Sequence, residues 1–125
     1  MATIKGYTDI EQSRKLAKIL PLESADMWWS RCTITDFGDG VLKVSYAVEP
    51  CNISQFRNTK EDIPCWSLAV LLDVLPSGYS AILTKSFDGK DYYCKIDGTP
   101  FETKAKNPID ACYNLILKLN ELKML

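Results

Sequence analysis

Histidine is absent from the 125 residues of this chain. Catalytic Ser-His-Asp and Cys-His arrangements, zinc sites with imidazole ligands and histidine pH switches all need that residue, so none of them can form here. Only a strongly shifted cysteine, lysine or carboxylate could replace it as a group that titrates near neutral pH. We therefore expect a protein that is not an enzyme, with no catalytic residue, no metal site and no cofactor.

Long apolar runs and paired cysteine motifs are also missing. The longest uncharged apolar run, about Cys65 to Leu72, is far shorter than the ~20 residues that cross a bilayer. The first residues lack the apolar stretch of a secretory signal. The five cysteines include no pair separated by two residues, which argues against a zinc knuckle or a thioredoxin-like motif. We expect a cytoplasmic protein without a membrane segment, whose cysteines are free and mostly buried thiols.

Neither sign of charge dominates the chain. Fifteen Lys and Arg stand against sixteen Asp and Glu, for a formal net charge of −1. This balance argues against a bulk electrostatic partner such as DNA, although it leaves room for a local basic patch. The length fits one domain over residues 1–125.

Three helices are expected, because three segments begin at a capping residue or a proline and carry apolar side chains at helical spacing. They run from Thr8 or Asp9 to Leu20, from Asp62 to about Leu75, and from Asn107 to about Leu122, with a short helical turn after Pro21. The second has almost no polar face, which predicts a central helix buried on all sides.

Two β-hairpins and one short strand are expected between these helices, because alternating apolar segments flank glycine-containing turns. The hairpins are Arg31–Thr35 with Val41–Val48, and Tyr79–Phe87 with Lys90–Ile96, and the strand is Phe101–Ala105. The segment from Pro50 to Glu61 shows no period and is read as a loop. The fold class is therefore α+β, with antiparallel sheet packed against about three helices in a single domain.

Two sets of apolar side chains are candidates for an interface. Trp28 and Trp29 are adjacent in an expected strand and point to opposite faces, so one should be buried and the other partly exposed as an anchor for a partner. The alternative is that the loop from Pro50 to Glu61 covers both tryptophans. On the last helix, Tyr113, Leu117 and Met124 form a second stripe, which would serve either as a homodimer face or as a wider core contact.

Polar candidates are fewer. Lys104 and Lys106 precede the last helix, whose free amides could join them in contacting a phosphate group. Acidic residues are interleaved with them, which is also typical of a solvated surface. Cys65 is placed in the first turn of the expected second helix, where a thiol pKa can fall. We favour its alternative role as a small buried apolar residue beside Trp66.

Several motifs carry a resemblance to known families. The segment Pro64-Cys65-Trp66-Ser67-Leu68 through Pro76, followed by Asn107-Pro108-Ile109-Asp110-Ala111, resembles a family of small uncharacterised proteins of Bacteroides-type bacteria and their phages or integrated elements. Cys65 stands where that family often has alanine. In its order of elements the C-terminal half is also similar to HicB-type antitoxins and to double-stranded-RNA-binding domains. Such topology alone says little about function.

Two functions follow as hypotheses. The first is a phage or mobile-element accessory protein that acts through protein–protein contacts, with a still unknown protein partner or as a homodimer. The alternative is a nucleic-acid-associated regulator that uses Lys104 and Lys106. Nucleic acid is the less favoured partner, because the charges of the chain are balanced.

Overall fold

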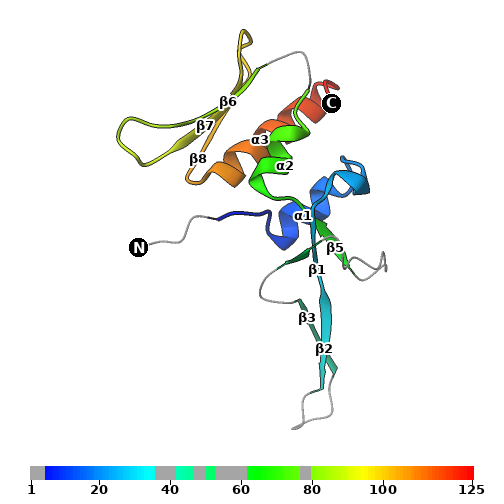
Figure 1. The fold of residues 1–125 in the computed structure, drawn as a ribbon. Helices are drawn as coiled ribbons and strands as arrows, with labels where there is room; N and C mark the ends of the chain where they lie inside the picture. The colour runs from blue at the N-terminus through cyan, green and yellow to red at the C-terminus, as the bar shows by residue number, and fades with distance from the viewer. Residues whose placement is uncertain (1–4, 36–41, 47–49, 53–61, 77–79) are drawn as a thin grey trace. The chain divides into compact units, whose positions relative to one another are not determined.

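The computed structural model describes residues 5–35, 42–46, 50–52, 62–76 and 80–125. Contacts group the chain into two compact units (Figure 1). The N-terminal unit is Asp9–Trp66, and the C-terminal unit combines Met1–Thr8 with Ser67–Leu125. Helices and antiparallel strands occur in both, which confirms the α+β class. That residues 1–125 act as a single domain stays a prediction.

The N-terminal unit opens with helix α1 (Ile10–Leu16). Asp9 caps it through a reciprocal pair of hydrogen bonds: Asp9 Oδ1 accepts from the backbone N of Gln12 at 2.8 Å, and Gln12 Oε1 accepts from the backbone N of Asp9 at 3.1 Å. This capping box satisfies two amides that the first turn would otherwise leave unpaired. The predicted start is confirmed. The helix is shorter than expected, and the short turn η1 (Leu22–Ser24) follows it.

The strands of the N-terminal unit are short and antiparallel. β1 (Met27–Trp29) lies between β4 (Cys51–Asn52) and β5 (Ile63–Cys65), while β2 (Arg31–Thr35) pairs with β3 (Leu42–Tyr46). The β2–β3 pairing confirms the first predicted hairpin, whose turn lies outside the described residues. β4 falls within the segment that we expected to be a loop, and that expectation is wrong for its two residues.

The expected second helix begins later than predicted. Ile63–Cys65 forms strand β5, which pairs with β1, and helix α2 covers only Leu68–Asp73. β5 is an edge strand, and an edge strand tolerates a proline such as Pro64 because one side of its backbone needs no ladder partner. Leu71 is fully buried, but Ala69 is exposed. The expectation of a helix buried on all sides is therefore wrong.

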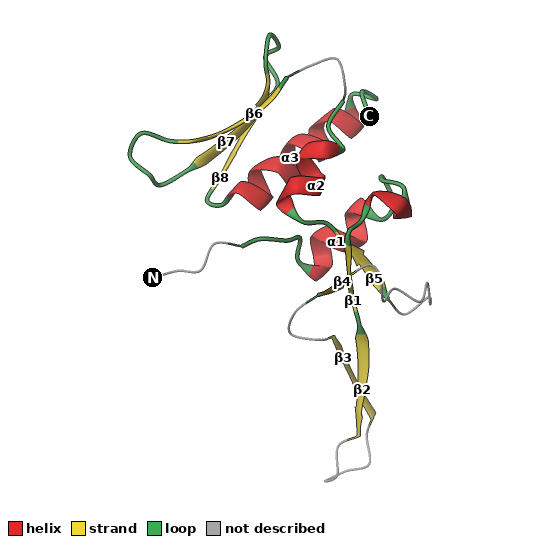
Figure 2. Cartoon of the chain, in the orientation of Figure 1, coloured by secondary structure: helices red, strands yellow, loops and turns green. Residues whose placement is uncertain are grey.

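The C-terminal unit contains a three-stranded meander in the order β6 (Ala81–Lys85), β7 (Tyr92–Ile96), β8 (Glu102–Ala105). Helix α3 (Pro108–Glu121) contacts β7, β8 and α2. Figure 2 shows α3 lying along one face of this sheet. The second predicted hairpin, the short strand and the last helix are all confirmed.

The start of α3 follows the predicted pattern. Asn107 Oδ1 accepts from the backbone N of Asp110 at 2.9 Å, and Pro108 occupies the first turn, where no amide partner is needed. The buried face of α3 consists of apolar residues at helical spacing, together with Tyr113: Ile109, Ala111, Cys112, Leu115, Ile116 and Leu119. Leu122, which we expected to continue this stripe, is exposed at the C-cap.

Candidate binding surface at one corner of the C-terminal sheet

The turn between β6 and β7 is fixed by its own hydrogen bonds. Ser86 donates its backbone N–H to Asp91 O at 2.8 Å, and Asp91 donates its backbone N–H to Ser86 Oγ at 3.0 Å. Asp88 Oδ1 accepts from the Ser86 hydroxyl and from the backbone N of Lys90. Gly89 has a φ of +75°, the left-handed conformation that this tight turn requires. Hydrogen bonds among residues 86–91 therefore order the tip of the hairpin.

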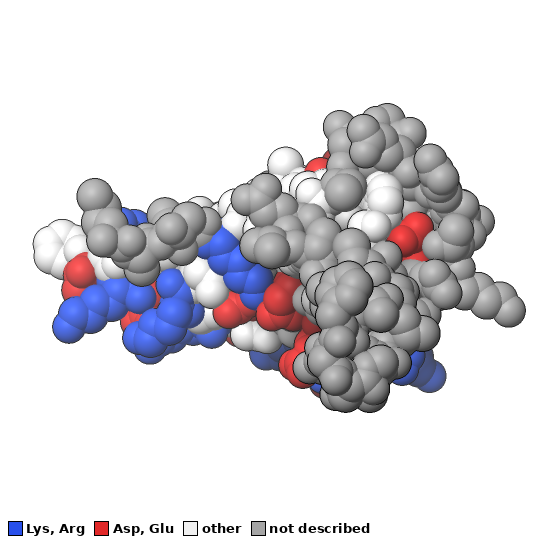
Figure 3. Space-filling model, turned by 90° about the horizontal axis from the view of Figure 1, so that it is seen from below, with Lys and Arg blue, Asp and Glu red and all other residues white. Residues whose placement is uncertain are grey.

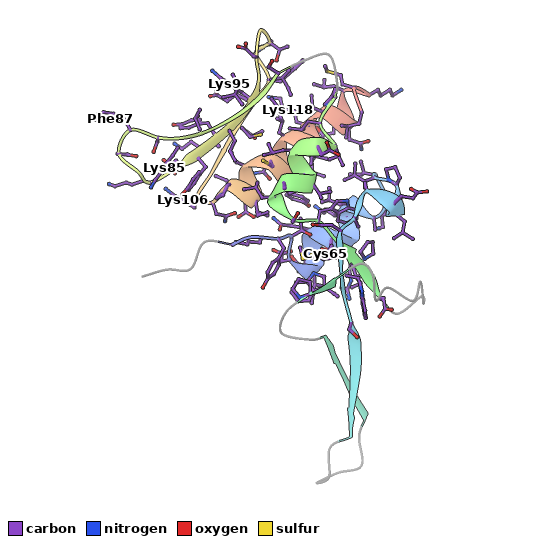
Figure 4. All side chains as sticks on the ribbon, in the orientation of Figure 1. Cys65, Lys85, Phe87, Lys95, Lys106 and Lys118 are labelled. Carbon is purple, nitrogen blue, oxygen red and sulfur yellow. The ribbon has the colours of Figure 1, made fainter. Side chains whose placement is uncertain are left out.

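Phe87 lies at this tip and is fully exposed, with a relative accessibility of 109%. It is the most exposed large apolar side chain in the described part of the chain. Figure 4 shows the ring projecting away from the sheet at the end of the hairpin. An apolar ring held in water on an ordered turn is the kind of group that a partner can bury at little entropic cost.

Lysine side chains lie close to this tip. A Cβ atom placed on Gly89 would lie 3.6 Å from Lys85 Cε and 3.9 Å from its Nζ, so the Lys85 side chain lies close to the turn. Lys90 is exposed in the turn itself. In Figure 4, Lys85, Phe87 and Lys106 are labelled at one end of the sheet. We name the set Lys85, Phe87, Lys90, Lys104 and Lys106 the basic corner.

Asp91 forms ion pairs with two lysines of the basic corner. Its Oδ1 lies 2.8 Å from Lys106 Nζ, and its Oδ2 lies 3.6 Å from Lys104 Nζ. The hydrogen bond from Lys106 is the main reason that the pKa of Asp91 falls below its ordinary value, and the same bond raises the pKa of Lys106. The lysine side chains remain 58% (Lys104) and 80% (Lys106) exposed. Both ammonium groups are therefore accessible to a partner.

The balance of charge at the corner is positive. Four lysines stand against the carboxylates of Asp88 and Asp91, which leaves a net charge of +2 on these residues. Figure 3 shows basic and acidic atoms interspersed over one part of the visible face, with no region of a single sign. The field is thus local and modest, which suits a small acidic patch better than an extended polyanion.

The two tryptophans are not the anchor that their position suggested. Trp28 is 8% exposed and Trp29 is 6% exposed, so the expectation that one of them would be partly exposed is wrong. They point to opposite faces of β1, and both faces are covered. The neighbouring Trp66 is fully buried, and its Nε1 donates to Ser24 Oγ at 2.9 Å. These rings belong to the core of the N-terminal unit.

The second stripe of α3 is only partly open. Tyr113 is 8% exposed and is a core residue, which agrees with the core-contact alternative at this position and not with the homodimer face. Leu117 and Met124 are half-buried. After the helix the chain turns back, with Lys123 at a φ of +58° and the backbone N of Met124 donating to Leu119 O at 2.9 Å. The homodimer face that this stripe suggested is thus reduced to two half-covered side chains.

Cys65 lies in strand β5 and is fully buried. It is therefore not in the first turn of a helix, and the reading of Cys65 as a reactive thiol loses that basis. The structure supports the alternative role, a small apolar residue of the core.

Lys104 and Lys106 were identified from the sequence, whereas Phe87 was missed. The sequence reading placed Phe87 as the last residue of a strand, and the strand ends two residues earlier, at Lys85. The available signal was its position directly before Asp88-Gly89: a side chain one residue from a tight turn has few neighbours to cover it.

No family model, curated protein or solved structure matches this chain. The resemblances to the Bacteroides-type family, to HicB-type antitoxins and to double-stranded-RNA-binding domains therefore stay predictions. Within the described ranges, no helix is long and apolar enough to cross a membrane. The same residues include no group of three cysteine, aspartate or glutamate side chains placed to hold a metal ion. In the described part of the chain, the fold is α+β and the basic corner presents the exposed Phe87 on a turn that also carries Lys85 and Lys90.

Proposed function

We propose that this chain is a non-enzymatic protein that acts by binding another protein, with the basic corner as its contact surface. The observation that carries the proposal is the full exposure of Phe87 on an ordered turn. Burying a phenylalanine side chain contributes roughly 1.5–3 kcal/mol, which is the size of a single interface hot spot. The absence of histidine removes the most common acid–base groups and supports a binding role over a catalytic one.

The charges around Phe87 indicate the chemistry of the partner. Lys85 and Lys90 lie at the same turn as Phe87, and Lys104 and Lys106 lie against Asp91 at the end of that turn, so a complementary surface has an apolar pocket bordered by Asp or Glu side chains. Such rim charges speed association and set orientation, while the buried ring supplies most of the affinity. The proposal includes a cytoplasmic setting and a role in a phage or mobile element. Self-association through Leu117 and Met124 is a separate part of it.

A photo-cross-linker placed at the tip tests this proposal. We would replace Phe87 by benzoylphenylalanine and irradiate cells that naturally express the chain, with the same substitution at exposed Asn120 of α3 as the matched control. We expect position 87 to give one discrete cross-linked protein that position 120 does not give. The combined change Lys85→Glu and Lys90→Glu should abolish that product. Identical products from both positions, or no product from position 87, would contradict the proposal.

Nucleic acid is a second candidate, because Lys104 and Lys106 are exposed just before α3 and Phe87 offers a ring on which a base could stack. Two observations weigh against it. Asp91 already lies against both lysines, and residues 67–125 contain no arginine, the residue best suited to phosphate recognition. A gel-shift assay with duplex and single-stranded RNA and DNA at ~50 mM salt, where phosphate contacts are strong, decides this. Absence of a shift removes the candidate.

A further inference from the structure

Two buried thiols meet where α3 packs on the sheet. The sulfur atoms of Cys94 in β7 and Cys112 in α3 lie 3.5 Å apart, and both residues are fully buried free cysteines. The thiol of Cys112 donates to the sulfur of Cys94. The two residues are 18 positions apart in the sequence. The fold therefore brings together two groups that no sequence motif connects.

We infer that Cys94 and Cys112 form a modification site, which an oxidant of the small-disulfide class converts into a disulfide joining β7 to α3. An S–S bond is about 2.05 Å long, so the sulfur atoms must approach each other by about 1.5 Å. The surrounding contacts hold the two elements in place for that step. Thr103 lies opposite Cys94 in the β7–β8 ladder, and its Oγ1 donates to the backbone O of Ala111, next to Cys112, at 2.6 Å.

The order of the reaction follows from the hydrogen bond between the thiols. The bond lowers the pKa of Cys94, which accepts it, and raises the pKa of Cys112, which donates it. Cys94 thiolate therefore attacks the small disulfide first, forming a mixed disulfide and releasing one thiolate. Cys112 then attacks the sulfur of Cys94 and releases the second thiolate. The protons of the two cysteines go to the two released thiolates, so two cysteines are oxidised and one small disulfide is reduced to two thiols.

Burial sets the rate of this reaction. Neither sulfur is accessible in the closed structure, so the oxidant reaches Cys94 only when α3 opens from the sheet. We expect slow oxidation at neutral pH, faster under mildly destabilising conditions, and a product in which the C-terminal unit resists unfolding better than before. The pair is buried between β7 and α3, whereas Phe87 is exposed on the turn after β6, and the inference does not depend on the proposed function.

The test uses the full chain and oxidised glutathione. The folded protein is incubated with an excess of the oxidant, blocked with N-ethylmaleimide and digested, and the linked peptides are identified by mass spectrometry. We expect the Cys94–Cys112 linkage, two hydrogens lighter than the reduced peptides, as the dominant product. In Cys112→Ser, Cys94 should instead end as the mixed disulfide with glutathione, whereas Cys65→Ser should leave the linkage unchanged.

Two outcomes overturn the inference. One is that Cys94 and Cys112 both remain free for alkylation after other cysteines have been oxidised. The other is that Cys94 links to other cysteines as often as to Cys112, as an unfolded chain would do. Because the main measurement is made on the natural sequence, a variant that fails to fold leaves the result intact. Circular dichroism before and after oxidation confirms that the product was formed from the folded chain.

Discussion

The ammonium group of Lys106 lies 2.8 Å from Asp91 Oδ1, which joins the residue just before the cap of α3 to the start of β7. Lys104 reaches the other oxygen of the same carboxylate at 3.6 Å. One carboxylate, with 12% of its side chain exposed, therefore links the β6–β7 turn, the end of β8 and the approach to α3.

Asp91→Asn should make the free energy of unfolding depend less on pH in the acidic range. The pKa of Asp91 is lowered in the folded chain, so its contribution is fully present above the ordinary value of 3.8 and is lost as the pH falls through the lowered value. The variant should unfold at lower denaturant concentration than the natural chain at neutral pH. The difference in denaturation midpoint between the two proteins should shrink at pH values below 3.8, the ordinary pKa of an aspartate. Chemical denaturation at several pH values measures this, and a difference that grows in acid would contradict it.

Asn107→Ala should destabilise the C-terminal unit by about 1 kcal/mol, because it removes the side-chain oxygen that accepts from the Asp110 amide. Asn107→Ser keeps a capping oxygen at the same position and is the matched control. Urea unfolding of the three proteins gives the comparison. Equal losses of stability in the two variants would show that the capping hydrogen bond does not stabilise the C-terminal unit.

Leu115→Ala should cost about 2–5 kcal/mol, since Leu115 is fully buried on the face of α3 that packs in the core. Leu122 lies about two turns further along and is exposed, so Leu122→Ala should change stability by less than about 0.5 kcal/mol. Thermal unfolding separates the two. If the exposed leucine proved as costly as the buried one, the placement of the end of α3 would be wrong.

Leu117→Glu tests the homodimer hypothesis. Leu117 is half-buried, so a charge there should break a dimer that uses this stripe while leaving the monomer folded. Sedimentation of the natural chain and the variant at high concentration, with circular dichroism as the control for folding, is the measurement. A natural chain that is strictly monomeric removes the dimer, and a variant that unfolds shows that Leu117 is a core residue.

Local signals in the sequence predicted the C-terminal unit well. The Asn107-Pro108 start, the apolar stripe of α3 as far as Leu119 and the Asp88-Gly89 turn are short-range features, and each forms as expected. The failures came from pairings between distant segments. Pro64 favours the first turn of a helix by its local preference. The backbone of β5 instead pairs with β1, more than thirty residues earlier, and this pairing outweighs the local preference.

The candidate site was predictable only in part. Lys104 and Lys106 stood out by charge, but their shared partner Asp91 is thirteen and fifteen residues away, and only the sheet register brings the three together. Trp28 and Trp29 were chosen as candidates because their side chains are large and apolar. The same property favours burial in the core, since β4 and β5 pair with β1 on both sides. Exposure of Phe87 depends on where β6 ends, which alternation alone does not fix.

The central claim is that Phe87 carries the binding energy, and the affinity of the protein captured by cross-linking at position 87 tests it most directly. Calorimetry would compare the natural chain with Phe87→Ala and with Leu122→Ala, which removes an exposed apolar side chain elsewhere on the same unit. The account predicts that Phe87→Ala weakens binding about 30-fold or more, equivalent to a hot spot of about 2 kcal/mol. Leu122→Ala should change the affinity less than about twofold. Equal affinities for Phe87→Ala and the natural chain would contradict it.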